Sequence, residues 1–243
     1  MIPVEAILEI LRSRRRTIWR SMIQAEATQE TTTNRLQTNH SVVKRLLLSK
    51  LRKPSRRIGA GLVLAPICIA LLVCTTAPDA KIQRVLGLRG TGKFEQALAE
   101  TNNQLGQLSK DSPDYWRFLL LKVQLAERPN FRSALPLLAE QPPPDQKFAT
   151  IRSRLKTEEA YIHMELSELP IAEKLAQESA EIAAPAKATR EVVIAQLLRA
   201  QIQAKLGRYA DAEQSARDAN ARVSELNDRS VEAYATDTLA HNL

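Results

Sequence analysis

Two patterns of apolar and polar positions divide the chain. The first is a run at 58–77 that contains no charged residue, IGAGLVLAPICIALLVCTTA. The second begins near residue 80 and continues to residue 243. There, Ala and Leu recur three and four positions apart between charged residues, as in LLRAQIQAKLGRYADAEQSARDA. This spacing places apolar side chains along one face of a helix. The sequence therefore predicts an all-α body at 80–243, preceded by one apolar helix.

The apolar run at 58–77 has the length of a membrane span, because as a helix it extends roughly 30 Å. Five of the eight residues at 50–57 are Lys or Arg, and the run ends in the small residues Thr75, Thr76 and Ala77, followed by Pro78. This order is typical of a secretory signal or a signal anchor. A buried core helix is the alternative, although Pro66 would be costly inside one. The positive-inside rule then keeps the basic flank in the cytoplasm and makes the body extracytoplasmic.

The end of the run resembles the signal peptide of a bacterial lipoprotein, through Leu71, Leu72, Val73 and Cys74. The Leu and the Cys match that pattern. Val73 departs from it, because the residue before the Cys is usually small. The resemblance implies lipid attachment at Cys74, and the alternative is an unmodified cysteine in a plain signal anchor.

The charge of the chain is concentrated at its N-terminal end. Residues 1–57 hold 13 Lys and Arg and 4 Asp and Glu, which leaves the remainder with 22 basic and 23 acidic residues. A near-neutral body argues against nucleic-acid binding, whereas a basic head fits contact with anionic lipid. We expect 1–57 to be a largely disordered cytoplasmic segment. Alternatively, translation starts later, at Leu51.

A weak repeat runs through the body. Four segments align on alanines that are 37, 38 and 40 residues apart, with an apolar or aromatic residue three positions before each. The alanines are Ala97, Ala134, Ala172 and Ala212, and the preceding residues are Phe94, Phe131, Leu169 and Tyr209. This period is near that of repeats built from two helices and a turn.

The repeat resembles the tetratricopeptide-repeat (TPR) family, most closely in the sequence from Gly207 through Tyr209 to Ala212. Gly92, Phe94 and Ala97 match in the same way, and Ala160, Ala200 and Ala219 fill further small-residue positions. Lys122, Pro129 and Ser167 depart from the pattern. The resemblance implies a solenoid of about four stacked helical hairpins at 80–243, followed by an incomplete fifth.

In that family the first helix of each hairpin lines a groove that binds a protein or peptide. The resemblance therefore implies partner contacts at Trp116, Arg154, Tyr161 and Gln201. Packing between repeats is the alternative role for Trp116 and Tyr161. The segment 229–243 is expected to be the first helix of the fifth repeat. Its stripe of Val231, Ala235, Thr238 and Leu239 is expected to be exposed, which would make self-association possible.

No catalytic or cofactor-binding set is recognisable. The stretch from Gly87 to Phe94 nearly matches a phosphate-binding loop, but Phe94 stands where a magnesium-binding hydroxyl is needed. Cys68 and Cys74 both lie in the apolar run, and His40, His163 and His241 are far apart. We therefore expect no enzyme activity, metal or cofactor.

Together these patterns predict a membrane-tethered TPR scaffold for protein–protein interaction on the extracytoplasmic side. The alternative is a sensor region from a larger protein, because the leader and the long-period repeats also resemble those of proteins with a C-terminal caspase-like CHAT protease domain.

Overall fold

The computed structural model describes residues 78–126 and 130–242. Of these, 78–87 belong to one compact unit and the rest to another. The regular structure in both described stretches is helical, and they contain no strand. This confirms the all-α prediction for the body. The expected apolar helix at 58–77 lies outside the described residues.

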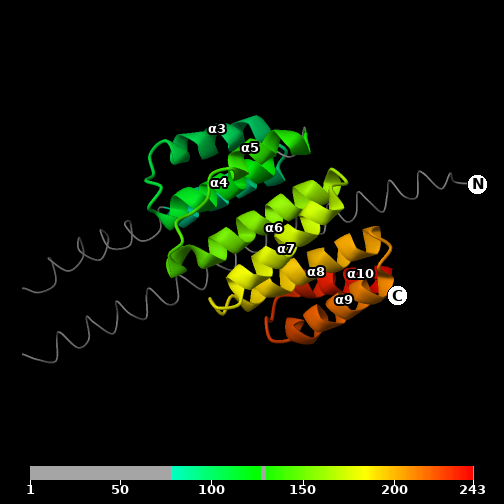
Figure 1. Cartoon of the computed structure of the whole chain (residues 1–243). Helices are drawn as coiled ribbons and strands as arrows, with labels where there is room; N and C mark the ends of the chain where they lie inside the picture. The colour runs from blue at the N-terminus through cyan, green and yellow to red at the C-terminus, as the bar shows by residue number, and fades with distance from the viewer. Residues whose placement is uncertain (1–77, 127–129, 243) are drawn as a thin grey trace, which may run out of the picture. The chain divides into compact units, whose positions relative to one another are not determined.

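After the helical residues 78–90, the larger unit contains seven α-helices of 12 residues or more among its described residues, and several shorter turns of helix (Figure 1). The long helices are α3 (Phe94–Leu105), α4 (Pro113–Ala126), α6 (Ala149–Glu165), α7 (Leu169–Ala183), α8 (Thr189–Lys205), α9 (Tyr209–Val223) and α10 (Arg229–Asn242). The short ones are η1 (Phe131–Ala134), α5 (Leu135–Leu138) and η2 (Gln146–Phe148).

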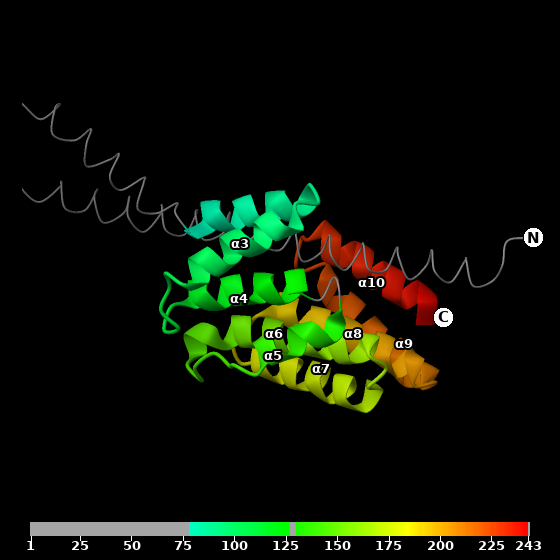
Figure 2. The same cartoon turned by 90° about the horizontal axis from the view of Figure 1, so that it is seen from above.

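Helix contacts follow two series. From α6 to α10 each helix contacts the next along the chain, and α3 contacts α4 in the same way. In addition α4 contacts α6, α6 contacts α8, and α8 contacts α10. We call α4, α6, α8 and α10 the first helices, because each opens a predicted hairpin. Figure 2 shows α6, α7, α8 and α9 as successive neighbours in this arrangement.

The turns inside the first, third and fourth hairpins share one geometry. Gly92, Ser167 and Gly207 have φ of 78°, 62° and 78°, in the left-handed region. At each, two backbone hydrogen bonds close the preceding helix in a Schellman motif, for example Gly207 N–H to Ala204 O and Arg208 N–H to Gln203 O. Gly92 is therefore a turn residue. Ser167 takes the same place as the glycines, although its side chain makes this conformation less favourable.

The alanines that define the repeat are all buried. Ala97, Ala134, Ala172 and Ala212 have no exposed surface. On α9 the buried positions continue at spacings of four, three and four, which is the period of one helix face. The full set on α9 is Ala212, Ala216, Ala219 and Val223. Small residues on this face allow the neighbouring helices to approach closely.

The second hairpin differs from the others, because its second helix is short. Phe131–Ala134 form a 3-10 turn, and α5 adds only four residues. Pro136 has no N–H to donate to the preceding turn, and the prolines at 142–144 prevent the helix from continuing. The repeat register is still present here, since Ala134 is buried like its counterparts.

The exposed stripe expected on the last helix was a wrong prediction. Val231, Ala235 and Thr238 are buried and Leu239 is half-buried, because α10 packs against α8 and α9. The outward face of α10 instead carries Glu232, Ala233, Thr236 and Ala240. Self-association through the buried stripe would require α10 to leave its neighbours.

The buried alanine face predicts a specific sensitivity to side-chain size. We expect Ala212→Leu to lower the free energy of unfolding by roughly 1 to 3 kcal/mol, because added carbons force packed helices apart. Ala210→Leu is the control, since Ala210 is exposed two residues earlier on α9; its effect should stay within about 0.5 kcal/mol. Urea unfolding measures both. Equal effects of the two substitutions would contradict close packing through Ala212.

Candidate functional site

The candidate site is the surface formed by the first helices, where the sequence predicts partner contacts. It takes Trp116 from α4, Arg154 and Tyr161 from α6, and Gln201 from α8. The helices that carry these residues contact one another in series. The predicted residues therefore lie on consecutive first helices. The burial and hydrogen bonds of each side chain decide what it can bind.

Trp116 is a core residue with 1% of its surface exposed. It packs in a cluster with Leu119, Val123, Leu138 and Phe148. Its indole Nε1–H donates a 2.7 Å hydrogen bond to the backbone oxygen of Lys110. Because both its ring surface and its donor are used, Trp116 has the packing role that the sequence left open as an alternative.

Tyr161 also serves in packing between hairpins. Its ring meets that of Phe131 edge to face, with centroids 6.0 Å apart, and the side chain is buried. Phe131 belongs to the second hairpin and Tyr161 to the third. The contact therefore joins consecutive repeats, and Tyr161 offers little surface to a partner.

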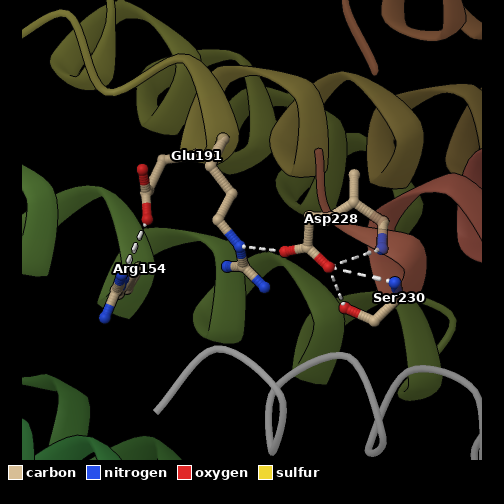
Figure 3. A network of polar contacts seen from close by, with 6 residues as sticks. Arg154, Glu191, Asp228 and Ser230 are labelled. Carbon is tan, nitrogen blue, oxygen red and sulfur yellow. Dashed lines mark hydrogen bonds and ion pairs between the residues drawn. The ribbon is translucent and has the colours of Figure 1, made fainter. Parts of the chain in front are cut away.

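Arg154 is engaged by an acidic residue of the next first helix. Its Nε and Nη2 groups donate hydrogen bonds of 3.0 and 2.8 Å to Oε1 of Glu191. The Glu191 side chain is only 6% exposed. Figure 3 shows this pair beside a second polar contact that involves Asp228. The charge of Arg154 is thus compensated within the protein.

The second contact joins α8 to α10. Arg190 Nε donates a 3.0 Å hydrogen bond to Oδ2 of Asp228, whose side chain is 5% exposed. The other oxygen, Oδ1, accepts from the backbone N–H and the hydroxyl of Ser230, at 3.0 and 2.6 Å. Asp228 therefore caps the N-terminus of α10 and pairs with α8 at the same time (Figure 3).

The pKa of Asp228 follows from these contacts. Burial acts to raise it, but the hydrogen bonds from Ser230 and Arg190 and the positive charge of Arg190 together lower it below its usual 3.8. The carboxylate therefore stays ionised over the whole neutral range and holds the start of α10 against α8.

Gln201 is half-buried, as is Arg154, whereas Trp116 and Tyr161 are buried. Its amide nitrogen donates a 3.2 Å hydrogen bond to the hydroxyl of Thr238 on α10. This bond adds a third link between first helices, next to the ion pairs of Arg154 and Arg190.

A second surface lies at the edge where the turns inside the hairpins occur. Among the described residues, the large apolar side chains that are exposed are Ile171, Leu206 and Tyr209, and Tyr209 is 64% exposed. All three lie at the turns of the third and fourth hairpins. We call them the turn-edge residues. The Tyr209 position was used to align the repeats, but its exposure was not predicted.

An ion pair connects the two turns of this edge. Arg208, in the fourth hairpin, pairs with Glu173 on α7. Burial acts to raise the pKa of Glu173, but hydrogen bonds from Arg208 and Gln203 and the charge of Arg199 lower it. Polar contacts thus join the two turns that carry the exposed apolar side chains.

The polar residues Arg190, Glu191 and Asp228 were missed in the sequence. A signal was present, because Arg154 precedes Glu191 by 37 residues and Arg190 precedes Asp228 by 38. Opposite charges separated by one repeat period indicate contact between equivalent helices of neighbouring hairpins.

Cys74, the predicted lipid site, lies outside the described residues. Within 78–126 and 130–242, no helix has both the length and the apolar character needed to cross a membrane.

The double role of Asp228 makes the docking of α10 sensitive to one substitution. We expect Asp228→Ala to speed amide exchange in α10 and to lower its opening free energy by roughly 3 kcal/mol, because the largely buried Arg190 loses this charged partner. Hydrogen exchange measures the change. Asp218→Ala, at an exposed position of α9, is the control and should leave α10 unchanged.

The pH dependence of α10 follows from the lowered pKa of Asp228. Its contribution to stability is complete above the ordinary value of 3.8 and is lost as the pH falls through the lower folded-state value. In the wild-type protein, the amides of α10 should therefore become less protected from hydrogen exchange over that acid range. In Asp228→Ala, the decrease in protection that comes from protonation of Asp228 should be missing. Identical acid profiles for the two proteins would contradict the assignment.

Comparison of the chain with protein-family models and with curated proteins gives no match. The buried alanines and the left-handed turns are therefore the observations from which a family can be proposed.

Proposed function

We propose that the chain is a membrane-tethered, TPR-like scaffold that binds a protein or peptide on the extracytoplasmic side of the membrane. The observation that carries this proposal is the coincidence of the sequence repeat with repeated local structure. The aligned alanines are buried, and left-handed turn residues lie 40 positions apart at Ser167 and Gly207.

The repeated contacts support a solenoid. Each hairpin contributes a first helix that contacts the first helix of the next, from α4 to α10. A hairpin cannot bury its apolar face alone, whereas stacked hairpins bury it against their neighbours. Stacks of this kind present long surfaces, which is why they commonly serve in protein recognition.

The turn edge is the part of this scaffold that we propose meets the partner. Trp116 and Tyr161 are buried and Arg154 is paired with Glu191. The turn-edge residues Ile171, Leu206 and Tyr209 are instead exposed. Tyrosine is enriched in protein interfaces, because its ring is apolar and its hydroxyl forms hydrogen bonds. Gln201 remains the candidate on the first-helix surface.

The tether is proposed from the sequence. The uncharged run at 58–77, with basic residues before it, fits one membrane-spanning or signal helix. The body then lies outside the inner membrane, and the basic segment 1–57 stays close to anionic lipid. Cys74 is the proposed site of lipid attachment.

Photocrosslinking can locate the partner. A benzophenone amino acid at position 209 is expected to capture a protein in intact membranes, because the Tyr209 side chain projects into solvent. The same probe at 201 tests the first-helix surface. Arg222 is the matched control, since it is exposed near the other end of α9. Immunoblotting and mass spectrometry identify the adducts.

Each result of this experiment is informative. An adduct at 209 and none at 222 supports contact at the turn edge. An adduct at 201 alone would show that the partner contacts the first helices rather than the turn edge, and would still support the scaffold function. If the membranes contain the folded protein but neither position 209 nor position 201 gives an adduct, this result contradicts the scaffold proposal.

The tether gives a separate prediction. We expect the protein in the membrane fraction, with the body open to protease from outside the inner membrane. If Cys74 carries lipid, mass spectrometry should find a mature N-terminus at Cys74 with acyl chains, and Cys74→Ser should block processing. An unmodified Cys74 in an uncleaved chain would instead establish a plain signal anchor. Full-length protein in the soluble cytoplasm would contradict both forms of tether.

A further inference from the structure

Two largely buried ion pairs join successive first helices in the same way, with the acidic side chains 5–6% exposed and the arginine side chains 14% exposed. Arg154 on α6 pairs with Glu191 on α8, and Arg190 on α8 pairs with Asp228 at the start of α10. The partners are 37 and 38 residues apart, which is one repeat period. In both pairs the arginine comes from the earlier hairpin and the acid from the later one (Figure 3).

Both pairs involve the first turn of α8, a helix whose remaining buried side chains are almost all apolar. Helix α8 is buried on nearly all sides, and its buried side chains are mainly Ala, Val, Ile and Leu. They comprise Val192, Val193, Ile194, Ala195, Leu197, Leu198, Ala200 and Ile202. Apolar packing is not directional. A helix with such a surface could also pack after slipping by one turn, about 5.4 Å along its axis.

Ion pairs respond to such a slip more strongly than apolar contacts do. Burying two charges removes them from water, and this cost offsets much of their attraction, so a buried pair adds little net stability. Separating the two charges while both remain buried is strongly unfavourable. A one-turn slip of α8 along α6 would separate Arg154 from Glu191 in this way.

We propose that the pairs Arg154–Glu191 and Arg190–Asp228 set the register of the first helices. They select one axial alignment of α6, α8 and α10 from several that apolar packing alone would permit. Their common direction, with the arginine on the earlier helix, also fixes which side of α8 faces each neighbour. This role goes beyond the proposed scaffold function, because it concerns the folded chain whether or not a partner is bound.

The test replaces both members of one pair with apolar residues. In the full chain, purified in a mild detergent, Arg154→Met and Glu191→Leu are made singly and together. Each single variant should exchange amides in α6 and α8 roughly a hundredfold faster, because one largely buried charge loses its oppositely charged partner. The double variant should keep a near wild-type urea midpoint but show two or more isotopic envelopes for peptides of α6 and α8.

A matched control separates register from charge. Lys156 and Glu159 form a 2.8 Å pair within α6, and Lys156→Met with Glu159→Leu removes the same charges without crossing between helices. This control should give a single envelope. A double variant of Arg154 and Glu191 that also gives one envelope, with wild-type exchange, overturns the proposal.

The charge-swapped variant covers the case in which the apolar double variant does not fold. Arg154→Glu with Glu191→Arg keeps opposite charges at the same two positions. It should recover the wild-type urea midpoint and a single isotopic envelope. Two results would show that the pair acts on stability rather than register, and would make the proposal wrong. The first is a charge-swapped variant that is as unstable as the single variants. The second is an apolar double variant that folds but is as unstable as the single variants.

Discussion

Close contact between helices through small side chains is the constraint on which this fold depends. Ala97, Ala172 and Ala212 occupy equivalent positions of different hairpins and have no exposed surface. A larger side chain at these positions would separate the helices and loosen every contact along the pair. The turns are adapted to the same constraint, because a left-handed residue such as Gly207 reverses the chain within a few residues. Short turns keep the paired helices adjacent.

Polar contacts specify the axial alignment of neighbouring helices, which alanine packing alone does not. Alanine surfaces are smooth and give little preference for one axial alignment over another. Buried polar side chains also link neighbouring helices, since Ser153, Thr157 and Ser179 join α6 to α7 through hydroxyl hydrogen bonds of 2.7 to 2.9 Å. Groups of this kind must find specific partners or be left unsatisfied in the interior. They therefore distinguish the native arrangement from nearby ones.

The sequence predicted the helices and their repeat more successfully than the state of individual side chains. Helical periodicity and the alanine spacing depend on local rules, and both identified the hairpins. Trp116 and Tyr161 were correctly placed on first helices, but an aromatic residue at such a position can line a groove or fill a core. Their burial depends on Phe131, Leu138 and other residues distant in sequence. The stripe on α10 was wrongly expected to be exposed for the same reason.

The distribution of charge and apolar surface also bears on where a partner can bind. A charged residue that is already paired inside the protein offers less to a partner, because its charge is compensated and some of its donors are engaged. If Arg154 left Glu191 to bind a partner, the carboxylate would remain almost fully buried without it. No such loss accompanies contact at Tyr209, whose ring is already in water. Recognition at the turn edge would therefore use surface that folding leaves available, whereas recognition through Arg154 would oppose the packing of the first helices.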